Sequence, residues 1–104
     1  MKIKFGKMFM QDLEHKMTIV SDEPELQEGY GLTQDECESF RAYISLCNAR
    51  KIREIEIPER MIECVKGEMQ NMADIAWGNA KGEGISAIGW ATSIESQLHK
   101  LTLS

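Results

Sequence analysis

The chain has 104 residues, which is enough for one domain around a single hydrophobic core, so residues 1–104 are expected to fold as one unit. Hydrophobic residues make up 42% and charged residues 28%, a balance that excludes the disordered and collagen-like classes. The formal net charge of −5 argues against direct binding to nucleic acid, because phosphates attract basic proteins.

The apolar runs and the cysteines indicate the compartment. Runs such as MTIV are a few residues long, whereas a membrane-spanning helix needs about 20 apolar residues, so no membrane association is expected. The N-terminal segment lacks the apolar stretch of a signal peptide. Cys37, Cys47 and Cys64 form no C-x-x-C pair and have no histidine at zinc-ligand spacing. Reduced thiols, no bound metal and a cytoplasmic location are therefore expected.

Residues 1–20 allow two interpretations. The β-branched and aromatic ends, KIKF and MTIV, predict a β-hairpin in which the polar QDLE forms the turn. Phe9, Leu13 and Met17, however, recur every four residues as on one face of a helix. A short helix over residues 7–16 is therefore the alternative.

A loop followed by a helix is expected next. Residues 21–32 contain one proline and two glycines and predict a loop. A helix is predicted over residues 33–51, because Thr33 followed by Glu36 is the capping-box pattern. The apolar face of this helix consists of Cys37, Phe40, Ile44 and Cys47. Tyr43 and Leu46 should widen it into one broad buried face.

The second half of the chain predicts two further helices. The alternating IREIEI of residues 52–57 is either an extended segment or the frayed end of the preceding helix. Pro58 should open a helix over residues 58–77, since proline is favoured at the first helical position, and Gly78 should end it. Its apolar stripe is Ile62, Val65, Met69, Met72 and Ala76.

A glycine-rich turn over residues 78–84 should connect this helix to a last one over residues 84–100. These two helices would form an antiparallel helical hairpin. The predicted fold class is thus α+β and mainly α, with an N-terminal β-hairpin or short helix followed by three helices.

The acidic block is the first candidate site. Residues 21–38 hold seven acidic side chains and no basic one, but they lack the spacing of a calcium loop. A solvated loop with a helix cap explains them without a function. The alternative is a surface that binds a basic site of a partner protein, with Tyr30 as its apolar anchor. The candidate partner-binding residues are Asp22, Glu23, Glu25, Glu28, Tyr30 and Glu38.

The glycine-rich turn is the second candidate site. Lys81, Gly82 and Gly84 precede a predicted helix N-terminus, where backbone amides can bind a phosphate. The stretch matches neither the P-loop nor the dinucleotide-binding pattern. An oligomeric binder of a small anionic ligand, such as a nucleotide, is the alternative function, but an ordinary interhelical turn explains the glycines fully and is the favoured interpretation.

Two hydrophobic residues beside the predicted stripe of the second helix could face either the core or a second copy of the chain. Met61 and Cys64 lie beside the apolar stripe of the second helix, so its apolar arc is wide. A wide core face explains this arc, and so does the interface of a structural homo-oligomer. Trp77 and Trp90 flank the glycine-rich turn and are expected to be buried at the base of the helical hairpin.

Catalytic patterns are missing from the sequence. Neither His15 nor His99 lies in H-E-x-x-H, and no serine lies in G-x-S-x-G, so a non-enzymatic protein without cofactor is expected. In size, acidity and lack of catalytic motifs, the chain resembles the small accessory proteins with which phages and mobile elements block host machinery. The resemblance implies a protein-binding domain of the inhibitor type.

Overall fold

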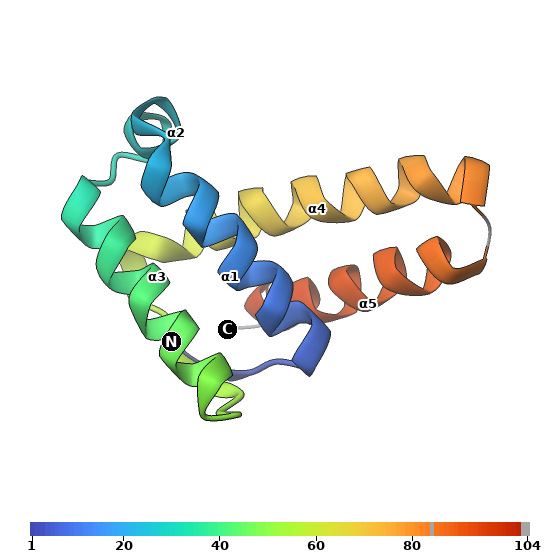
Figure 1. The fold of residues 1–104 in the computed structure, drawn as a ribbon, viewed down its shortest axis with the longest axis horizontal. Coiled ribbons are helices and arrows are strands. Elements are labelled where there is room, and N and C mark those ends of the chain that lie inside the picture. Colours follow the sequence, from blue (N-terminus) through green and yellow to red (C-terminus); the bar gives the residue numbers. More distant parts are fainter. Residues whose placement is uncertain (84, 103–104) are drawn as a thin grey trace.

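In the residues that the structure describes, two short strands and five α-helices make up the fold (Figure 1). The computed structural model describes the backbone of residues 1–83 and 85–102, and the side chains of residues 1–79 and 87–101. In chain order the elements are β1 (Lys2–Lys4), α1 (Lys7–Asp22), α2 (Pro24–Gly29), α3 (Gln34–Ala49), β2 (Glu54–Glu56), the 3-10 turn η1 (Glu59–Met61), α4 (Ile62–Glu83) and α5 (Ile85–Thr102). The expected class, mainly helical with a small β component, is confirmed, as is the packed pair of C-terminal helices.

The N-terminal segment combines both expected elements. β1 belongs to an antiparallel two-stranded sheet, with Ile3 opposite Ile55, so the second strand comes from β2 and not from the MTIV segment. The MTIV segment lies in α1, which is longer than the helix considered for residues 7–16. The helical spacing prevails there because it buries one complete face of α1 in the core.

The loop expected over residues 21–32 is wrong in its central part, where α2 forms. Pro24 occupies the first helical position, where its missing amide proton leaves no hydrogen bond unmade. Gln27 is buried, and its side-chain amide donates to the carbonyl oxygen of Val20 at 2.9 Å. The acidic segment is therefore attached to the end of α1 as a short helix.

The predicted start of α3 is confirmed. The Thr33 hydroxyl accepts a hydrogen bond from the Glu36 amide at 3.2 Å, and a Glu36 carboxylate oxygen accepts one from the Thr33 amide at the same distance. The four residues of the predicted apolar face are buried. Residues 54–56 form a strand, so the extended alternative for the segment after α3 is the correct one.

α4 differs from the prediction at both ends. It begins at Ile62, after Pro58 and η1, and it continues through Gly78 to Glu83. The end expected at Gly78 is therefore wrong, and most of the expected turn over residues 78–84 is helical. α5 packs along α4 and stabilises this stretch, which outweighs the weak preference of glycine for a helix end. Both helices contribute buried alanines to this contact: Ala73, Ala76, Ala87 and Ala91.

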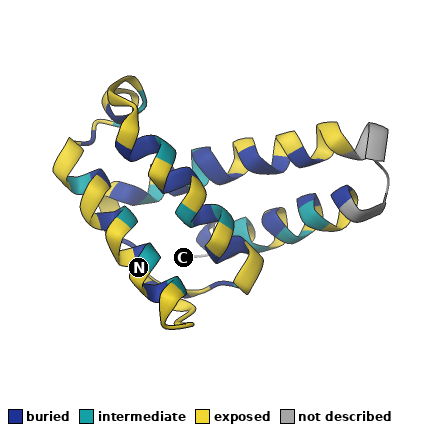
Figure 2. Ribbon diagram, viewed as in Figure 1, coloured by how far each residue is buried: buried dark blue, intermediate teal, exposed yellow. Residues whose placement is uncertain are grey.

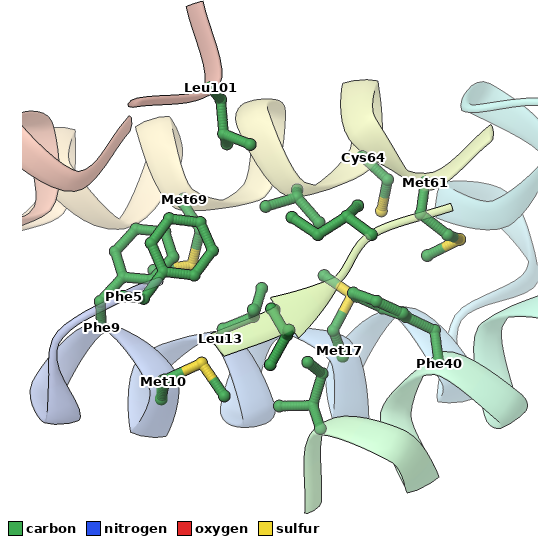
Figure 3. Packing of buried hydrophobic residues seen from close by; sticks show 14 of the residues in the cluster. Phe5, Phe9, Met10, Leu13, Met17, Phe40, Met61, Cys64, Met69 and Leu101 are labelled. Carbon is green, nitrogen blue, oxygen red and sulfur yellow. The ribbon is translucent and has the colours of Figure 1, made fainter. Parts of the chain in front are cut away.

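The core lies where α1 crosses α3 and α4 (Figure 3). Phe5 and Phe9 stack with their ring centroids 4.2 Å apart. Met61 and Cys64 are 2% and 0% exposed, so the wide apolar arc of α4 is covered within one chain. This burial supports the core-face interpretation and removes the reason for a methionine-mediated oligomer. Figure 2 shows that α4 and α5 extend beyond the other helices and expose their outer faces.

Candidate protein-binding site

A surface groove of about 520 Å³ lies between α3 and the segment formed by β2 and η1. α3 contributes one wall, with Asp35, Glu36, Ser39, Phe40 and Tyr43; Glu56, Pro58 and Met61 form the other. Phe40 and Met61 are nearly inaccessible and form an apolar floor, whereas Tyr43 is 36% exposed. The spacing of Asp35, Ser39 and Tyr43 places them on one face of α3, one turn apart.

Side-chain hydrogen bonds close the groove at both ends. At one end the Tyr43 hydroxyl accepts a hydrogen bond from the Glu56 amide at 2.9 Å. At the other end Arg60 pairs with Glu36 at 2.6 Å and donates to the carbonyl oxygen of Gly31 at 2.7 Å. These contacts hold α3 against the strand segment, so the groove exists before any partner binds.

The rim of the groove is acidic. The hydrogen bond from Arg60, assisted by the Thr33 amide, lowers the pKa of Glu36 to about 2, so this carboxylate stays ionised at physiological pH. Glu56 pairs with the N-terminal ammonium group at 2.9 Å. Asp35 is exposed beside them, and within the described chain it has no ion-pair partner. Arg60 and the N-terminal ammonium group thus neutralise two of the three rim carboxylates, and Asp35 supplies the uncompensated negative charge that favours a cationic group.

The structure keeps most of the sequence-predicted partner-binding residues at the surface. Those at the end of α1, in the link to α2 and in α2 itself are exposed: Asp22, Glu23, Glu25 and Glu28. Glu38 is exposed on α3, where it accepts a hydrogen bond from the Gln34 side-chain amide at 2.8 Å. Glu38 thus lies within the stretch of α3 that lines the groove, and the other four carboxylates precede α3 along the chain.

Tyr30 is half-buried against the core and lines a different surface hollow, beside α4 and α5. Its hydroxyl donates to the buried Glu68 carboxylate at 2.8 Å, and burial raises the pKa of the phenol. The Lys16 ammonium lies 3.9 Å from the same carboxylate and donates to the Asn71 side chain at 2.7 Å. Tyr30 therefore joins the end of α2 to α4. The exposed aromatic residue beside the groove, where a partner could make an apolar contact, is Tyr43.

Substitution of Gly67 tests the packing of Tyr30. A Cβ atom at Gly67 would collide with the Tyr30 hydroxyl, so Gly67→Ala should lower the free energy of unfolding by about 1–2 kcal/mol. Gly78→Ala is the matched control in the same helix. It meets no atom within 4 Å, and it should stabilise the fold by about 0.5–1 kcal/mol because alanine favours helices. Urea denaturation measures both, and equal effects would contradict the described packing.

The ligand-binding alternative falls largely outside the described residues. Gly84 is not described, and neither is the side chain of Lys81 nor the surroundings of Gly82. The backbone of residues 78–83, however, is α-helical and not the glycine-rich turn that this alternative assumed.

The two tryptophans lie in different environments. Trp90 is half-buried against the core, and its indole donates to the Asp12 carboxylate at 2.8 Å, which joins α5 to α1. Trp77 is 39% exposed, so its expected burial is wrong; its indole donates to the Glu95 carboxylate. Trp77 lies in the part of α4 that extends past α1 and α3 and packs against α5.

The cysteines are buried and unpaired, as expected. Burial, assisted by the nearby Glu68 carboxylate, raises the pKa of the Cys64 thiol to about 12. Burial likewise raises the pKa of the Cys37 thiol. Both groups therefore remain protonated at neutral pH and are poor nucleophiles. Among the described residues, no group of three histidine, cysteine or carboxylate side chains could hold a metal ion.

The sequence did not reveal the groove, although one signal was present. Tyr43 widens the apolar face of α3 toward the surface, as Leu46 does at 48% exposure. Both residues were expected to be buried, and that expectation is wrong, because no element in the described part of the chain packs fully over this side of α3. The opposite wall could not be anticipated, because β2 and Pro58 reach α3 only through tertiary packing.

Models of known protein families, curated protein sequences and solved structures give no significant match to the chain. Within the described chain, no helix combines the length and apolar character needed to cross a lipid bilayer. The functional interpretation therefore depends on the chain's own residues.

Proposed function

We propose that this protein is a non-enzymatic protein-binding domain that holds a basic segment of a partner protein in the α3–β2 groove and on the adjoining acidic surface. The observation that carries the proposal is a preformed groove with an apolar floor and a carboxylate rim. Such a groove is complementary to an apolar side chain with lysine or arginine next to it.

Two physical contributions support this assignment. Transfer of a Leu- or Phe-sized side chain from water into an apolar groove contributes about 1.5–3 kcal/mol, which can anchor a segment. Acidic residues around the groove accelerate encounter with a basic partner and reject acidic ones. The volume of about 520 Å³ suits one large side chain and part of its neighbours.

The other candidate functions have less support. The backbone of residues 78–83 is helical and lacks the turn that the anionic-ligand alternative assumed, and Met61 and Cys64 are already covered within the chain. An inhibitor would be one form of the proposed domain, because covering a basic nucleic-acid-binding surface blocks it. Three buried, unpaired thiols suit a reducing compartment such as the cytoplasm.

Charge reversal on α2 tests the proposal. The partner is first isolated by affinity capture and eluted with a salt gradient. Glu28→Lys should then reduce its association rate constant about tenfold at low ionic strength, because steering depends on the acidic surface. The difference should disappear near 1 M salt, where the screening length is about 3 Å.

Asp74→Lys is the matched control for this experiment. Asp74 is also exposed, but it lies in the part of α4 that extends away from α3. The variant changes the net charge by the same amount, but at a position far from the acidic residues of α2 and α3. Equal association rates for the two variants would show that overall charge, and not the acidic surface, controls binding.

A further inference from the structure

The segment Arg50–Arg53 has the chemistry that the groove requires. Ile52 is 43% exposed although it is a large apolar residue. Arg50, Lys51 and Arg53 surround it in the sequence and are all exposed. Lys51, Ile52 and Arg53 line a surface hollow together with Lys7. In the part of the chain that the structure describes, none of these four cations forms an ion pair.

The backbone fixes this segment at the end of α3. The Ile52 amide donates to the Cys47 carbonyl at 2.8 Å and the Lys51 amide to the Asn48 carbonyl at 3.2 Å, which is a Schellman motif. Lys51 has a φ of 58°, a left-handed conformation that normally favours glycine. Lys51 therefore occupies a backbone conformation that glycine adopts with less strain. Non-glycine residues in this conformation are frequent at functional sites.

The geometry of one chain separates the segment from its own groove. The stretch of α3 that lines the groove ends at Tyr43, whereas Ile52 follows the C-terminal end of this helix. The Schellman motif holds the segment there. A contact between the two surfaces therefore requires two molecules.

We propose that the occupant of the groove is a second copy of this chain, which inserts Ile52 between α3 and β2 while its cations face the carboxylate rim. This inference rests on the proposed function and names the partner. The contact joins two different surfaces of the same chain, so it is head-to-tail and assembles rings or open chains.

Two variants each remove one side of the proposed contact and leave the other side intact. Ser39→Trp fills the groove of one copy and leaves its basic segment intact. Ile52→Asp removes the apolar group and reverses the local charge while the groove stays open. Both positions are exposed, and Ser96→Trp on the exposed face of α5 is the matched control for the added indole ring.

Sedimentation velocity and light scattering, from about 10 μM to 1 mM protein, measure the assembly. Wild type and Ser96→Trp should form species that grow with concentration, whereas Ser39→Trp and Ile52→Asp alone should remain monomers. An equimolar mixture of the last two should give a heterodimer that grows no further, because only one competent groove and one competent segment remain. Lys51→Gly should raise the melting temperature and weaken assembly several-fold.

Wild type that stays monomeric at 1 mM overturns the inference, as does assembly that survives Ser39→Trp or Ile52→Asp. A mixture that stays monomeric also overturns it. If wild type is monomeric while a captured partner is lost from Ser39→Trp, the self-contact is excluded and the proposed function stands. If Ser39→Trp retains both assembly and partner, both are excluded.

Discussion

Replacement of Glu68 by alanine is expected to lower the free energy of unfolding by about 3 kcal/mol, because it leaves a buried cation without its counterion. Glu68 is 7% exposed and Lys16 is 8% exposed. The substitution also removes the acceptor of the Tyr30 hydroxyl. An unpaired buried hydroxyl adds to the loss. Urea denaturation followed by circular dichroism measures the change.

Glu63→Ala is the control in the same helix. Glu63 also pairs with a lysine at 3.9 Å, but its side chain is 82% exposed, so its loss should cost about 0.5 kcal/mol or less. If Glu68→Ala costs no more than Glu63→Ala, the buried network does not stabilise the fold. The packing assigned to Tyr30 would then be incorrect.

Replacement of Phe40 by alanine should cost about 3 kcal/mol, through lost burial and the cavity that remains. Phe40 is 4% exposed and forms both part of the core and the floor of the groove. Leu46→Ala in the same helix is the control and should cost less, since Leu46 is 48% exposed. Equal losses of free energy would show that the groove has no packed floor.

The double role of Phe40 affects the choice of functional variants. A loss of binding in Phe40→Ala could follow from unfolding, so this substitution cannot separate stability from recognition. Ser39 lies at the surface of the same groove. Its substitution changes the shape of the groove with little effect on the core.

Acid should weaken the contact that closes one end of the groove. The pKa of Glu36 is lowered from its usual 4.5 to about 2, so its ion pair with Arg60 favours the folded state above pH 4.5. This contribution decreases as the pH falls from 4.5 to 2, where the folded-state carboxyl group becomes protonated.

Local patterns in the sequence predicted some of these elements correctly. Thr33 and Glu36 fixed the start of α3, because a capping box depends only on neighbouring residues. The apolar spacing identified most of the buried residues of α3 and α4 for the same reason, although Tyr43 and Leu46 are exposed. Where local signals competed, as at the helical Phe9, Leu13 and Met17 against the strand-like ends of residues 1–20, the sequence left both structures open.

Tertiary contacts account for what the sequence could not indicate. β1 pairs with a strand about 50 residues away, and no local pattern specifies that partner. α4 passes Gly78 because α5 packs against it. The groove likewise forms between α3 and the β2–η1 segment, which are distant in the sequence. The sequence therefore indicated the acidic residues of its rim, but not that Phe40 and Met61 together form an apolar floor.

Affinity capture with three versions of the chain is the most direct test of the protein-binding groove. Wild type, Ser39→Trp and Ser96→Trp are immobilised at equal density and exposed to the same lysate, and bound proteins are eluted with salt and quantified by mass spectrometry. A basic protein, or the chain itself, should be retained by wild type and Ser96→Trp and lost from Ser39→Trp. Retention of the same proteins by all three would contradict binding in the groove.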